Sequence, residues 1–316
     1  MKAILATRIG GPEVLELREV PDPQPKPGEV LVRVHAVGVN FADTMATRGL
    51  YPGGPEAPYI PGLEFAGSVV ETGEKVVGVV PKGAYAEQIS ARRESLLPWP
   101  ERLNAAEAAA FPINYFTAYF AYWMADAKEN ERVLIHAAAG GVGTAAVELG
   151  RLFGVETFGT ASSDEKLARL AQLGLDHGIN YKKVDYESAV LEMTGNEGVD
   201  IVFEMLGGEH TAKSTRCLRS LGRLIIYGVA SGQPPQFDFP GMFQRNASVH
   251  ALWLTPMAQH HEHMTQAWED MLPWLAEGKL HPIVGHQLPL AQAAEAHRLL
   301  AERKNFGKIV LLPAGA

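Results

Sequence analysis

Cysteine is nearly absent from this chain, which has a single one, Cys217, among its 316 residues. One cysteine excludes an intrachain disulfide and any metal site that is built from several cysteines. Cys217 follows Thr215 and Arg216 in a segment that we expect to be helical. We therefore interpret it as a buried structural residue and not as a nucleophile.

Positive charge and long apolar runs are scarce as well. The 28 Lys and Arg residues are outnumbered by 36 Asp and Glu residues, which gives a net charge of −8 and argues against a surface that binds nucleic acid. No apolar run is long enough to cross a bilayer, and the first residues lack the pattern of a signal peptide. We expect a cytoplasmic protein, bound neither to nucleic acid nor to a membrane, with enough apolar residues for two domains.

Glycine, in contrast, is concentrated where an apolar run ends. Residues 133–144 read Val-Leu-Ile-His-Ala-Ala-Ala-Gly-Gly-Val-Gly-Thr, which predicts a strand, a tight turn and a helix. Against the dinucleotide fingerprint G-x-G-x-x-G, Ala138 stands at the first glycine, Gly140 at the second and Gly143 at the third. Small residues here let the backbone approach a diphosphate at the helix N-terminus. A glycine-rich turn of an ordinary α/β protein is the alternative at this point.

The segments after this turn alternate between strand and helix patterns. A helix is expected at residues 164–173, closed by Gly174, with Ser162 and Glu165 as a capping box at its start. The six expected strands lie at residues 133–135, 155–160, 179–181, 200–204, 223–227 and 248–253. This alternation is typical of βαβ units and predicts a doubly wound parallel sheet.

The N-terminal third differs, because short alternating segments such as residues 29–39 are separated by proline- and glycine-rich loops, which indicates a β-rich domain. The C-terminal tail, with two helices and a final strand at residues 308–312, is expected to return to it. The predicted domains are therefore 1–112 with 256–316, and 113–255. The cluster from His260 to His263 lacks the spacing of a zinc-binding helix, so no metal is expected there.

The residues after the second strand of the sheet indicate the cofactor. Proteins that bind NAD place an acidic residue about 20 positions beyond the glycines, where it holds the ribose 2′-hydroxyl. Residues 160–163 are Thr-Ala-Ser-Ser instead, and Lys166 follows one helical turn later. This combination favours NADPH, whose 2′-phosphate needs space and positive charge. The alternative is that Lys166 is an ordinary surface lysine.

With these residues in place, the chain resembles the zinc-independent branch of the medium-chain dehydrogenase/reductase superfamily, and within it the NADPH:quinone oxidoreductases related to ζ-crystallin. The resemblance implies a Rossmann domain with a doubly wound parallel sheet and a β-rich GroES-like catalytic domain. The matching segments are residues 37–43, 60–67, 116–119, 137–143, 159–166, 179–181, 227–232 and 305–308. Residues 71–78 are shorter than is usual in the family.

Zinc-dependent members of the superfamily carry a ligand cysteine in the segment that resembles residues 38–43 and a Gly-His-Glu in the one that resembles residues 62–64. Here the first segment has Asn40 and no cysteine, and Leu63 replaces the histidine. The resemblance therefore implies no catalytic zinc, and without this Lewis acid the reduction of a conjugated carbonyl is favoured over ordinary alcohol oxidation.

The resemblance also assigns roles to individual residues. Gly140, Gly141 and Val142 would contact the diphosphate; Ser162, Lys166 and Tyr181 the 2′-phosphate; and Asn40, Thr117, Gly207, Gly228 and Arg303 other parts of the nucleotide. Tyr51 would lie at the substrate end, where its hydroxyl donates to the acceptor oxygen or its ring covers the cofactor. Asp43 is expected to cap a helix as an ionised carboxylate.

These observations predict an NADPH-dependent reductase of quinones or other α,β-unsaturated carbonyls, which acts by direct hydride transfer. An enoyl-thioester reductase of the same superfamily is a second possibility, and a non-catalytic NADPH-binding protein of the crystallin-like or RNA-binding kind is a third. The edge strand at residues 248–253 needs a partner, so we expect a homodimer.

Overall fold

The computed structural model describes residues 1–314 and divides into two compact units. The first unit joins Met1–Ile113 to Leu275–Ala316, and the second is Asn114–Trp274. The chain passes from one unit to the other within α3 (Pro112–Met124) and again within α10 (His261–Ala276). Among the described residues, no helix has both the length and the apolar character needed to span a membrane.

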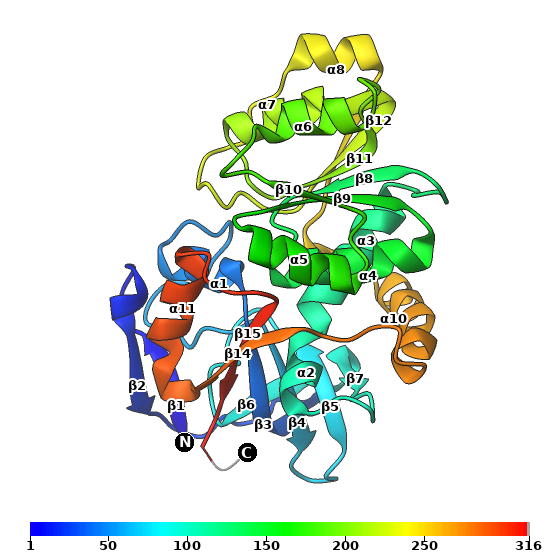
Figure 1. Ribbon diagram of the computed structural model, residues 1–316. Coiled ribbons are helices and arrows are strands. Elements are labelled where there is room, and N and C mark those ends of the chain that lie inside the picture. Colours follow the sequence, from blue (N-terminus) through cyan, green and yellow to red (C-terminus); the bar gives the residue numbers. More distant parts are fainter. Residues whose placement is uncertain (315–316) are drawn as a thin grey trace. The chain divides into compact units, whose positions relative to one another are not determined.

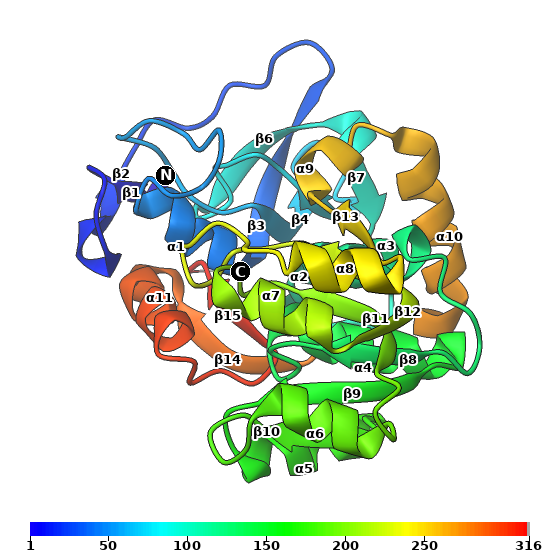
Figure 2. The ribbon, with the colours of Figure 1, turned by 90° about the horizontal axis from the view of Figure 1, so that it is seen from above.

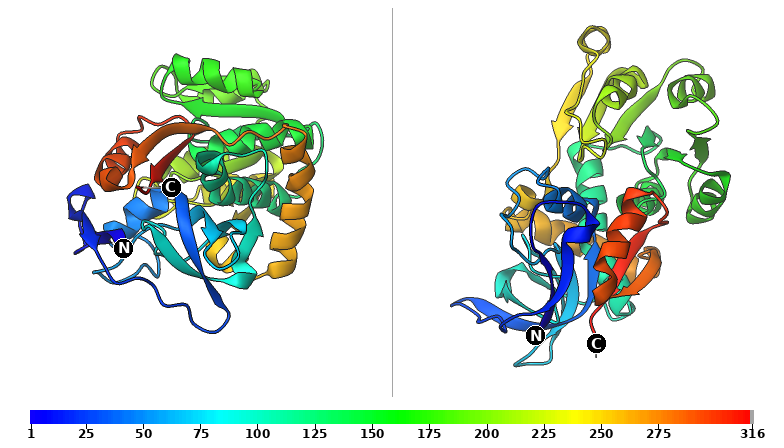
Figure 3. Two further views of the ribbon diagram at one scale, coloured as in Figure 1. Left: turned by 90° about the horizontal axis from the view of Figure 1, so that it is seen from below. Right: turned by 90° about the vertical axis from the view of Figure 1, so that its left-hand side faces the viewer.

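The first unit is built on a seven-stranded sheet with the order β14-β15-β3-β4-β5-β7, in which β6 also pairs with β3. Figure 3 shows that the C-terminal strands lie beside the N-terminal ones within this unit. Its elements are β1 (Lys2–Ala6), β2 (Leu15–Glu19), β3 (Glu29–Val39), α1 (Phe41–Thr47), β4 (Glu64–Val69), β5 (Lys75–Val79), β6 (Gln88–Arg92), β7 (Leu96–Pro98), α2 (Ala105–Ala110), β14 (Val284–Pro289), α11 (Ala293–Ala301) and β15 (Lys308–Leu312), with 3-10 turns at Pro12–Val14, Arg93–Ser95 and Leu290–Gln292.

Strand β3 holds this sheet together because it pairs with β4, β6 and β15. Its valines alternate with polar residues and pack into one apolar cluster with Phe65 of β4 and Ile309 of β15. The sequence pattern predicts this strand and the last strand at 308–312, and both predictions are confirmed. The tail thus supplies two strands to the N-terminal domain.

The second unit contains a parallel six-stranded sheet with the order β10-β9-β8-β11-β12-β13. This order is that of the doubly wound dinucleotide-binding fold, which confirms the predicted fold class. Its elements are β8 (Arg132–Ile135), α4 (Gly141–Phe153), β9 (Glu156–Ala161), α5 (Asp164–Leu173), β10 (His177–Asn180), α6 (Tyr186–Met193), β11 (Val199–Glu204), α7 (Glu209–Arg216), β12 (Leu218–Ile226), α8 (Phe239–Arg245), β13 (Ser248–Ala251) and α9 (Leu254–Met257).

Helices cover both faces of this sheet. Helices α3, α4 and α5 lie on one face, and α6, α7 and α8 lie on the other (Figure 1), where Figure 2 shows α7 and α8 over β11 and β12. Because both faces are covered, the central strands are almost continuously apolar, as in the buried Val133, Leu134 and Ile135 of β8. Cys217 is buried at the end of α7, where burial raises the pKa of its thiol to about 12, in agreement with a structural role.

The second domain boundary lies further along the chain than the sequence predicts. Residues 256–274 were expected in the first domain, but they cluster with the second unit. The reason is that α10 packs against α3: Phe116 stacks on Trp268 with 6.4 Å between ring centroids, and the Tyr119 hydroxyl donates to Asp270. The helical period of α10 predicts an apolar face, but it does not identify the helix that covers that face.

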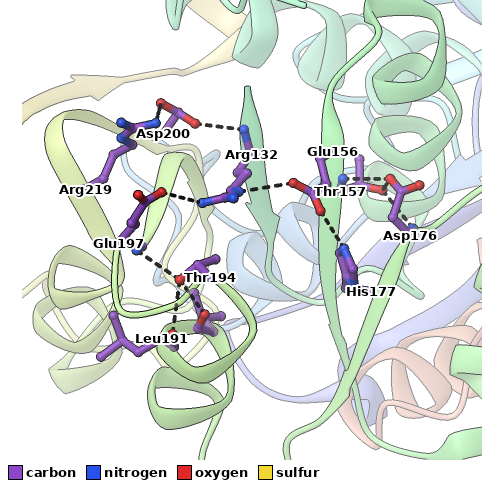
Figure 4. A network of polar contacts seen from close by, with 12 residues as sticks. Arg132, Glu156, Thr157, Asp176, His177, Leu191, Thr194, Glu197, Asp200 and Arg219 are labelled. Carbon is purple, nitrogen blue, oxygen red and sulfur yellow. Dashed lines mark hydrogen bonds and ion pairs between the residues drawn. The ribbon is translucent and has the colours of Figure 1, made fainter. Parts of the chain in front are cut away.

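An ion-pair network joins the amino ends of neighbouring strands in the second unit (Figure 4). Arg132 at the start of β8 pairs with Glu156 of β9 and with Glu197, and its backbone N–H donates to Asp200 of β11. Glu156 also pairs with His177 of β10 at 2.7 Å. These charges are used for strand alignment at the amino edge, so the chemistry of the unit must be sought at the carboxyl edge.

Candidate functional site

The turn after β8 requires small residues at the positions that the fingerprint predicts. A Cβ on Gly143 would lie 2.5 Å from both Ala137 O and Ala138 Cα, so no larger residue fits there. Ala138 replaces the first glycine of the fingerprint, and its N–H donates to Thr160 O at 3.0 Å. Gly140 caps α4, whose first N–H groups and positive dipole end are suited to an anion.

A residue that the sequence analysis missed lies against this helix start. A Cβ on Gly141 would stand 2.6 Å from both terminal atoms of the Asn114 amide, which places Asn114 of α3 beside the first turn of α4. Thr117, predicted to contact the nucleotide, is buried one turn later in the same helix. Asn114 and Thr117 are three residues apart, so both lie on one face of the helix. This spacing is the sequence signal from which Asn114 could have been predicted.

The residues that were predicted to contact the 2′-phosphate lie just beyond the ends of β9 and β10. Tyr181 follows β10, and its N–H donates to Ala161 O of β9 at 3.2 Å. The predicted capping role of Ser162 is wrong, because Ser163 is the N-cap of α5 and its hydroxyl accepts from Lys166 N–H. Ser162 therefore lies in the connection between β9 and the cap, where it is not needed to start the helix.

Three basic side chains gather around this point. Burial lowers the pKa of Lys166, and the positive charges of Lys182 and Arg169 lower it further. Glu165 acts in the opposite direction and raises the pKa of Lys166, so the repulsion among the cations is partly compensated. A bound anion would compensate it further. Arg169 follows Lys166 by three positions in α5, so the helical spacing predicts their proximity, whereas Lys182 is brought in by β10.

Two glycines complete the carboxyl edge of the sheet. Gly207 follows β11 with φ +77°, and a Cβ on it would stand 2.5 Å from Gln233 O. Gly228 follows β12 and lies against Met205. Because all six strands are parallel, the ends of β8 to β12 meet at one edge, and the predicted residues that follow these strands lie along that edge. Thr117 is the exception, because it lies in α3.

The other predicted residues belong to the first unit. Asn40 caps α1 and is buried, Tyr51 begins a turn in which its carbonyl accepts from Gly54 N–H, and Arg303 is exposed after α11 with φ +56°. Helix α11 packs against α1. Within this unit, Asn40 and Arg303 thus belong to neighbouring elements.

Asn40 is held by a buried ion pair that sequence analysis did not predict. Lys308 Nζ of β15 pairs with Glu64 Oε1 of β4 and donates to Asn40 Oδ1 at 2.6 Å, while Asn40 Nδ2 donates to Glu64 Oε1 at 2.9 Å. Glu64 Oε2 accepts the N–H of Ile113 at 2.7 Å. Lysine only donates and carboxylate only accepts, so the two charges fix which way the Asn40 amide faces.

Helix α1 begins at Phe41 and not near Thr44 as expected, so Asn40 is its N-cap and Asp43 lies in its first turn. Asp43 completes a capping box there, because its Oδ2 accepts the Asn40 N–H at 2.8 Å. Burial raises the pKa of Asp43 to about 7, so the carboxyl is only partly ionised at neutral pH, whereas an ionised carboxylate was predicted. Its other neighbour is the Tyr85 hydroxyl, which donates at 3.1 Å and also contacts His297 Nε2. Burial lowers the pKa of His297 to about 3, so this ring is neutral.

Family comparisons agree with the two units. The description "Alcohol dehydrogenase GroES-like domain" matches residues 26–101, and "Zinc-binding dehydrogenase" matches residues 173–311. A zinc ion does not fit the Asn40 cluster, because the Lys308 ammonium already compensates Glu64 and occupies Asn40 Oδ1, and Leu63 offers no ligand atom. Within residues 1–314, no group of three or more His, Cys, Asp or Glu residues is arranged to hold a metal.

Relatives match along the whole chain. The quinone oxidoreductase of Sus scrofa is 34% identical over 99% of this chain and 98% of its own length. Among solved structures, the quinone oxidoreductase from Thermus thermophilus, described with its NADPH complex, is 39% identical with a TM-score of 0.89 over 99% of this chain and 100% of that one. The Escherichia coli quinone oxidoreductase complexed with NADPH is 28% identical with a TM-score of 0.91 over the same shares. The chain belongs to the quinone oxidoreductase family of the medium-chain dehydrogenase/reductase superfamily.

Proposed function

We propose that this protein is an NADPH-dependent reductase of quinones or other α,β-unsaturated carbonyls, which works by direct hydride transfer and without zinc. The observation that carries the proposal is the segment at the end of β9, where residues 160–163 contain no carboxylate and Lys166 follows in the first turn of α5, within electrostatic reach of Arg169 and Lys182. The relatives described with NADPH support the same cofactor.

The residues at the carboxyl edge fit each part of the cofactor. The first N–H groups of α4, from Gly141 onward, bind the diphosphate, and Asn114 and Thr117 border it from α3. Lys166 and Tyr181 bind the 2′-phosphate, together with Ser162. Gly207 and Gly228 contact other parts of the nucleotide, and the family resemblance assigns the same role to Asn40 and Arg303 of the first unit. Bound NADPH supplies a hydride, and the protein orients it and excludes water.

A conjugated acceptor suits a site without a metal. The quinone or enone spreads the charge that arrives with the hydride, so correct positioning provides much of the rate acceleration. Asp43 is buried beneath the Tyr85 hydroxyl and accepts the Asn40 N–H, which commits it to local structure. Tyr51 is therefore the group that we assign to the acceptor oxygen, as a hydrogen-bond donor.

Tyr51→Phe should change catalysis only modestly. The substitution removes one hydrogen bond, which is worth about 0.5–1.5 kcal/mol, so kcat/KM for a quinone should fall about two- to tenfold. Steady-state kinetics at saturating NADPH measure this change. Loss of all turnover with NADPH binding intact would show instead that the hydroxyl is the obligatory proton donor.

The purified protein should contain no stoichiometric zinc. The reason is the Lys308 ammonium, which fills the cation position beside Glu64. Elemental analysis of the purified chain and activity after prolonged treatment with a chelator test this. One zinc per chain, with activity lost on its removal, would overturn the expectation.

We further propose a homodimer that forms through β13. This strand ends the six-stranded sheet, and Val249 and Trp253 expose 37% and 45% of their surface at or just beyond it. An unpaired apolar edge is normally covered by a partner, and a two-fold axis would pair β13 with its copy.

Light scattering at micromolar concentration should therefore give the mass of a dimer, and Val249→Lys should shift it toward the monomer. Val184→Lys is the matched control, since Val184 is also exposed but lies before α6, away from the edge. A monomeric unmodified protein, or equal effects of the two lysines, would contradict pairing through β13.

The substrate class is tested by NADPH consumption with quinones, conjugated enones, enoyl thioesters and simple ketones. The proposal predicts turnover of quinones or enones and little turnover of simple ketones. A preference for enoyl thioesters would assign the chain to the enoyl reductases of the superfamily. NADPH binding without turnover of any acceptor would indicate a non-catalytic protein.

A further inference from the structure

Five residues form a hydrogen-bonded chain at the carboxyl ends of the three central strands of the second unit. His136 and Ala137 follow β8, Thr160 lies in β9, Glu204 ends β11 and Ser214 lies in α7. All except Ala137 are buried, with exposures of 0–2%. A polar chain this deep lies directly beneath the loops that bind the nucleotide.

The donors in this chain all point toward Glu204. The Ser214 hydroxyl donates to Glu204 Oε2 at 2.5 Å, so Ser214 Oγ accepts from His136 Nε2 at 2.9 Å. His136 Nδ1 then accepts from the Thr160 hydroxyl at 3.2 Å, and Thr160 in turn accepts the N–H of Ala137 at 3.3 Å. Burial lowers the pKa of His136, in agreement with a neutral ring.

Glu204 is compensated only by neutral donors. Its Oε1 accepts the N–H groups of Leu206 at 2.5 Å and Gly207 at 3.0 Å, and its Oε2 accepts from Ser214. His136 lies 3.8 Å away but is neutral, and across residues 1–314 no lysine or arginine pairs with this carboxylate. A desolvated charge without a cation is costly, and such charges are concentrated at functional sites.

The strand order places this charge under one half of the cofactor. A dinucleotide lies across the point where the strand order reverses, which here falls between β8 and β11. The basic residues bind the 2′-phosphate over β9 and β10, and α4 binds the diphosphate after β8. The nicotinamide half therefore extends over the ends of β11 and β12, where Leu206 and Gly207 follow Glu204.

We propose that Glu204 is a buried counter-charge that favours the oxidised nicotinamide over the reduced one, and so assists hydride donation. The inference rests on the proposed function, because it concerns NADPH at that site. The reduced ring is neutral and the oxidised ring carries one positive charge, so a fixed carboxylate attracts only the oxidised form. A preorganised negative charge stabilises positive charge that develops during the reaction. Glu204 acts through its charge, across the Leu206–Gly207 loop and without touching the ring, so it is not a catalytic residue.

Glu204→Gln removes the charge and keeps the shape. The amide oxygen still accepts from Leu206 and Gly207, and the amide nitrogen donates to Ser214. The Ser214 hydroxyl then turns to donate to His136, whose ring adopts its other neutral tautomer and donates to Thr160. Each residue of the chain keeps at least one partner, but the Thr160 O–H and the second N–H of the new amide have no acceptor within it. The variant should therefore fold with reduced stability.

The readout is the ratio of the dissociation constants of NADP⁺ and NADPH, measured by calorimetry. For Glu204→Gln this ratio should rise on the order of tenfold, as expected for one charge acting over roughly 10 Å at an effective dielectric of about 20. Binding of adenosine 2′,5′-bisphosphate, which lacks the nicotinamide half, should change less than about twofold.

Two further variants separate charge from structure. Ser214→Ala removes a hydrogen bond but keeps the carboxylate, so it should lower thermal stability and leave the ratio near that of the unmodified protein. Glu148→Gln neutralises another buried carboxylate, two turns into α4, and should also leave the ratio unchanged.

The inference would be overturned, while the proposed function stands, if Glu204→Gln weakened the binding of NADP⁺ and NADPH equally and so left the ratio unchanged. It would also be overturned if Ser214→Ala shifted the ratio as much as Glu204→Gln does. Failure of the unmodified protein to bind NADPH would overturn the proposed function and this inference together. A raised ratio with adenosine 2′,5′-bisphosphate unaffected would support the counter-charge.

Discussion

Replacing Lys166 by glutamate should reverse the cofactor preference of this protein from NADPH to NADH. A charge-assisted contact to a phosphate is worth about 1.5–3 kcal/mol. Lys166→Ala alone should therefore raise the dissociation constant of NADPH by about one to two decades and leave that of NADH nearly unchanged. Glutamate goes further, because a carboxylate repels the 2′-phosphate and accepts from the 2′-hydroxyl that NADH carries instead. Dissociation constants of both cofactors measure the change.

Lys183→Ala provides the matched control for the lysine substitutions. Lys183 lies close in sequence to Tyr181, but it is exposed and pairs with Asp164 at the start of α5. Its removal should change the dissociation constant of neither cofactor by more than about twofold. If Lys166→Ala weakened NADPH and NADH equally, the lysine would support α5 and not the 2′-phosphate.

Replacing Lys308 by methionine should cause the largest loss of stability. The pair of Lys308 and Glu64 is almost completely buried, with side-chain exposures of 2% and 0%. Removing one partner of a buried pair leaves an uncompensated charge and typically costs about 3–5 kcal/mol. The free energy of unfolding in urea should fall by about this amount. The double variant Lys308→Met with Glu64→Gln should recover most of it, because no buried charge is left alone.

The exposed pair of Lys279 and Glu277 offers the comparison, with side-chain exposures of 50% and 55%. Lys279→Met should change the free energy of unfolding by less than about 1 kcal/mol. A Lys308→Met protein as stable as the unmodified one, or a double variant less stable than Lys308→Met, would show that the ammonium does not compensate Glu64.

Local sequence patterns predicted the parallel sheet, because the periodicity and composition that indicate each strand, turn or helix lie within that segment alone. Strand β8, the glycine turn and α4 are consecutive, so their period and composition are enough to place them. The end of α5 is also predicted correctly, because Gly174 adopts φ +103° at its C-cap. The start of α5 at Asp164 is confirmed as well, and only its cap was misassigned by one residue. Ser162 and Ser163 are equally good capping types, and only the chain path from β9 decides between them.

Long-range partners could not be predicted in this way. Asn40 and Lys308 are separated by 268 positions, and no pattern in either segment indicates that β15 lies beside β3. The ionisation of Asp43 was mispredicted for the same reason, because its capping role is local but its burial under Tyr85 comes from a distant loop. The sequence identified the residue types of the site, and the tertiary contacts decided their electrostatics.

Transfer of deuterium from C4-labelled NADPH to a conjugated enone tests the central claim most directly. Each of the two C4-deuterated stereoisomers is incubated with the protein and the enone, and the product is analysed by mass spectrometry and NMR. Direct hydride transfer at this site predicts that one stereoisomer, and not the other, delivers deuterium to the β-carbon of the enone. Product without deuterium from either stereoisomer, or deuterium on the carbonyl carbon, would contradict the account.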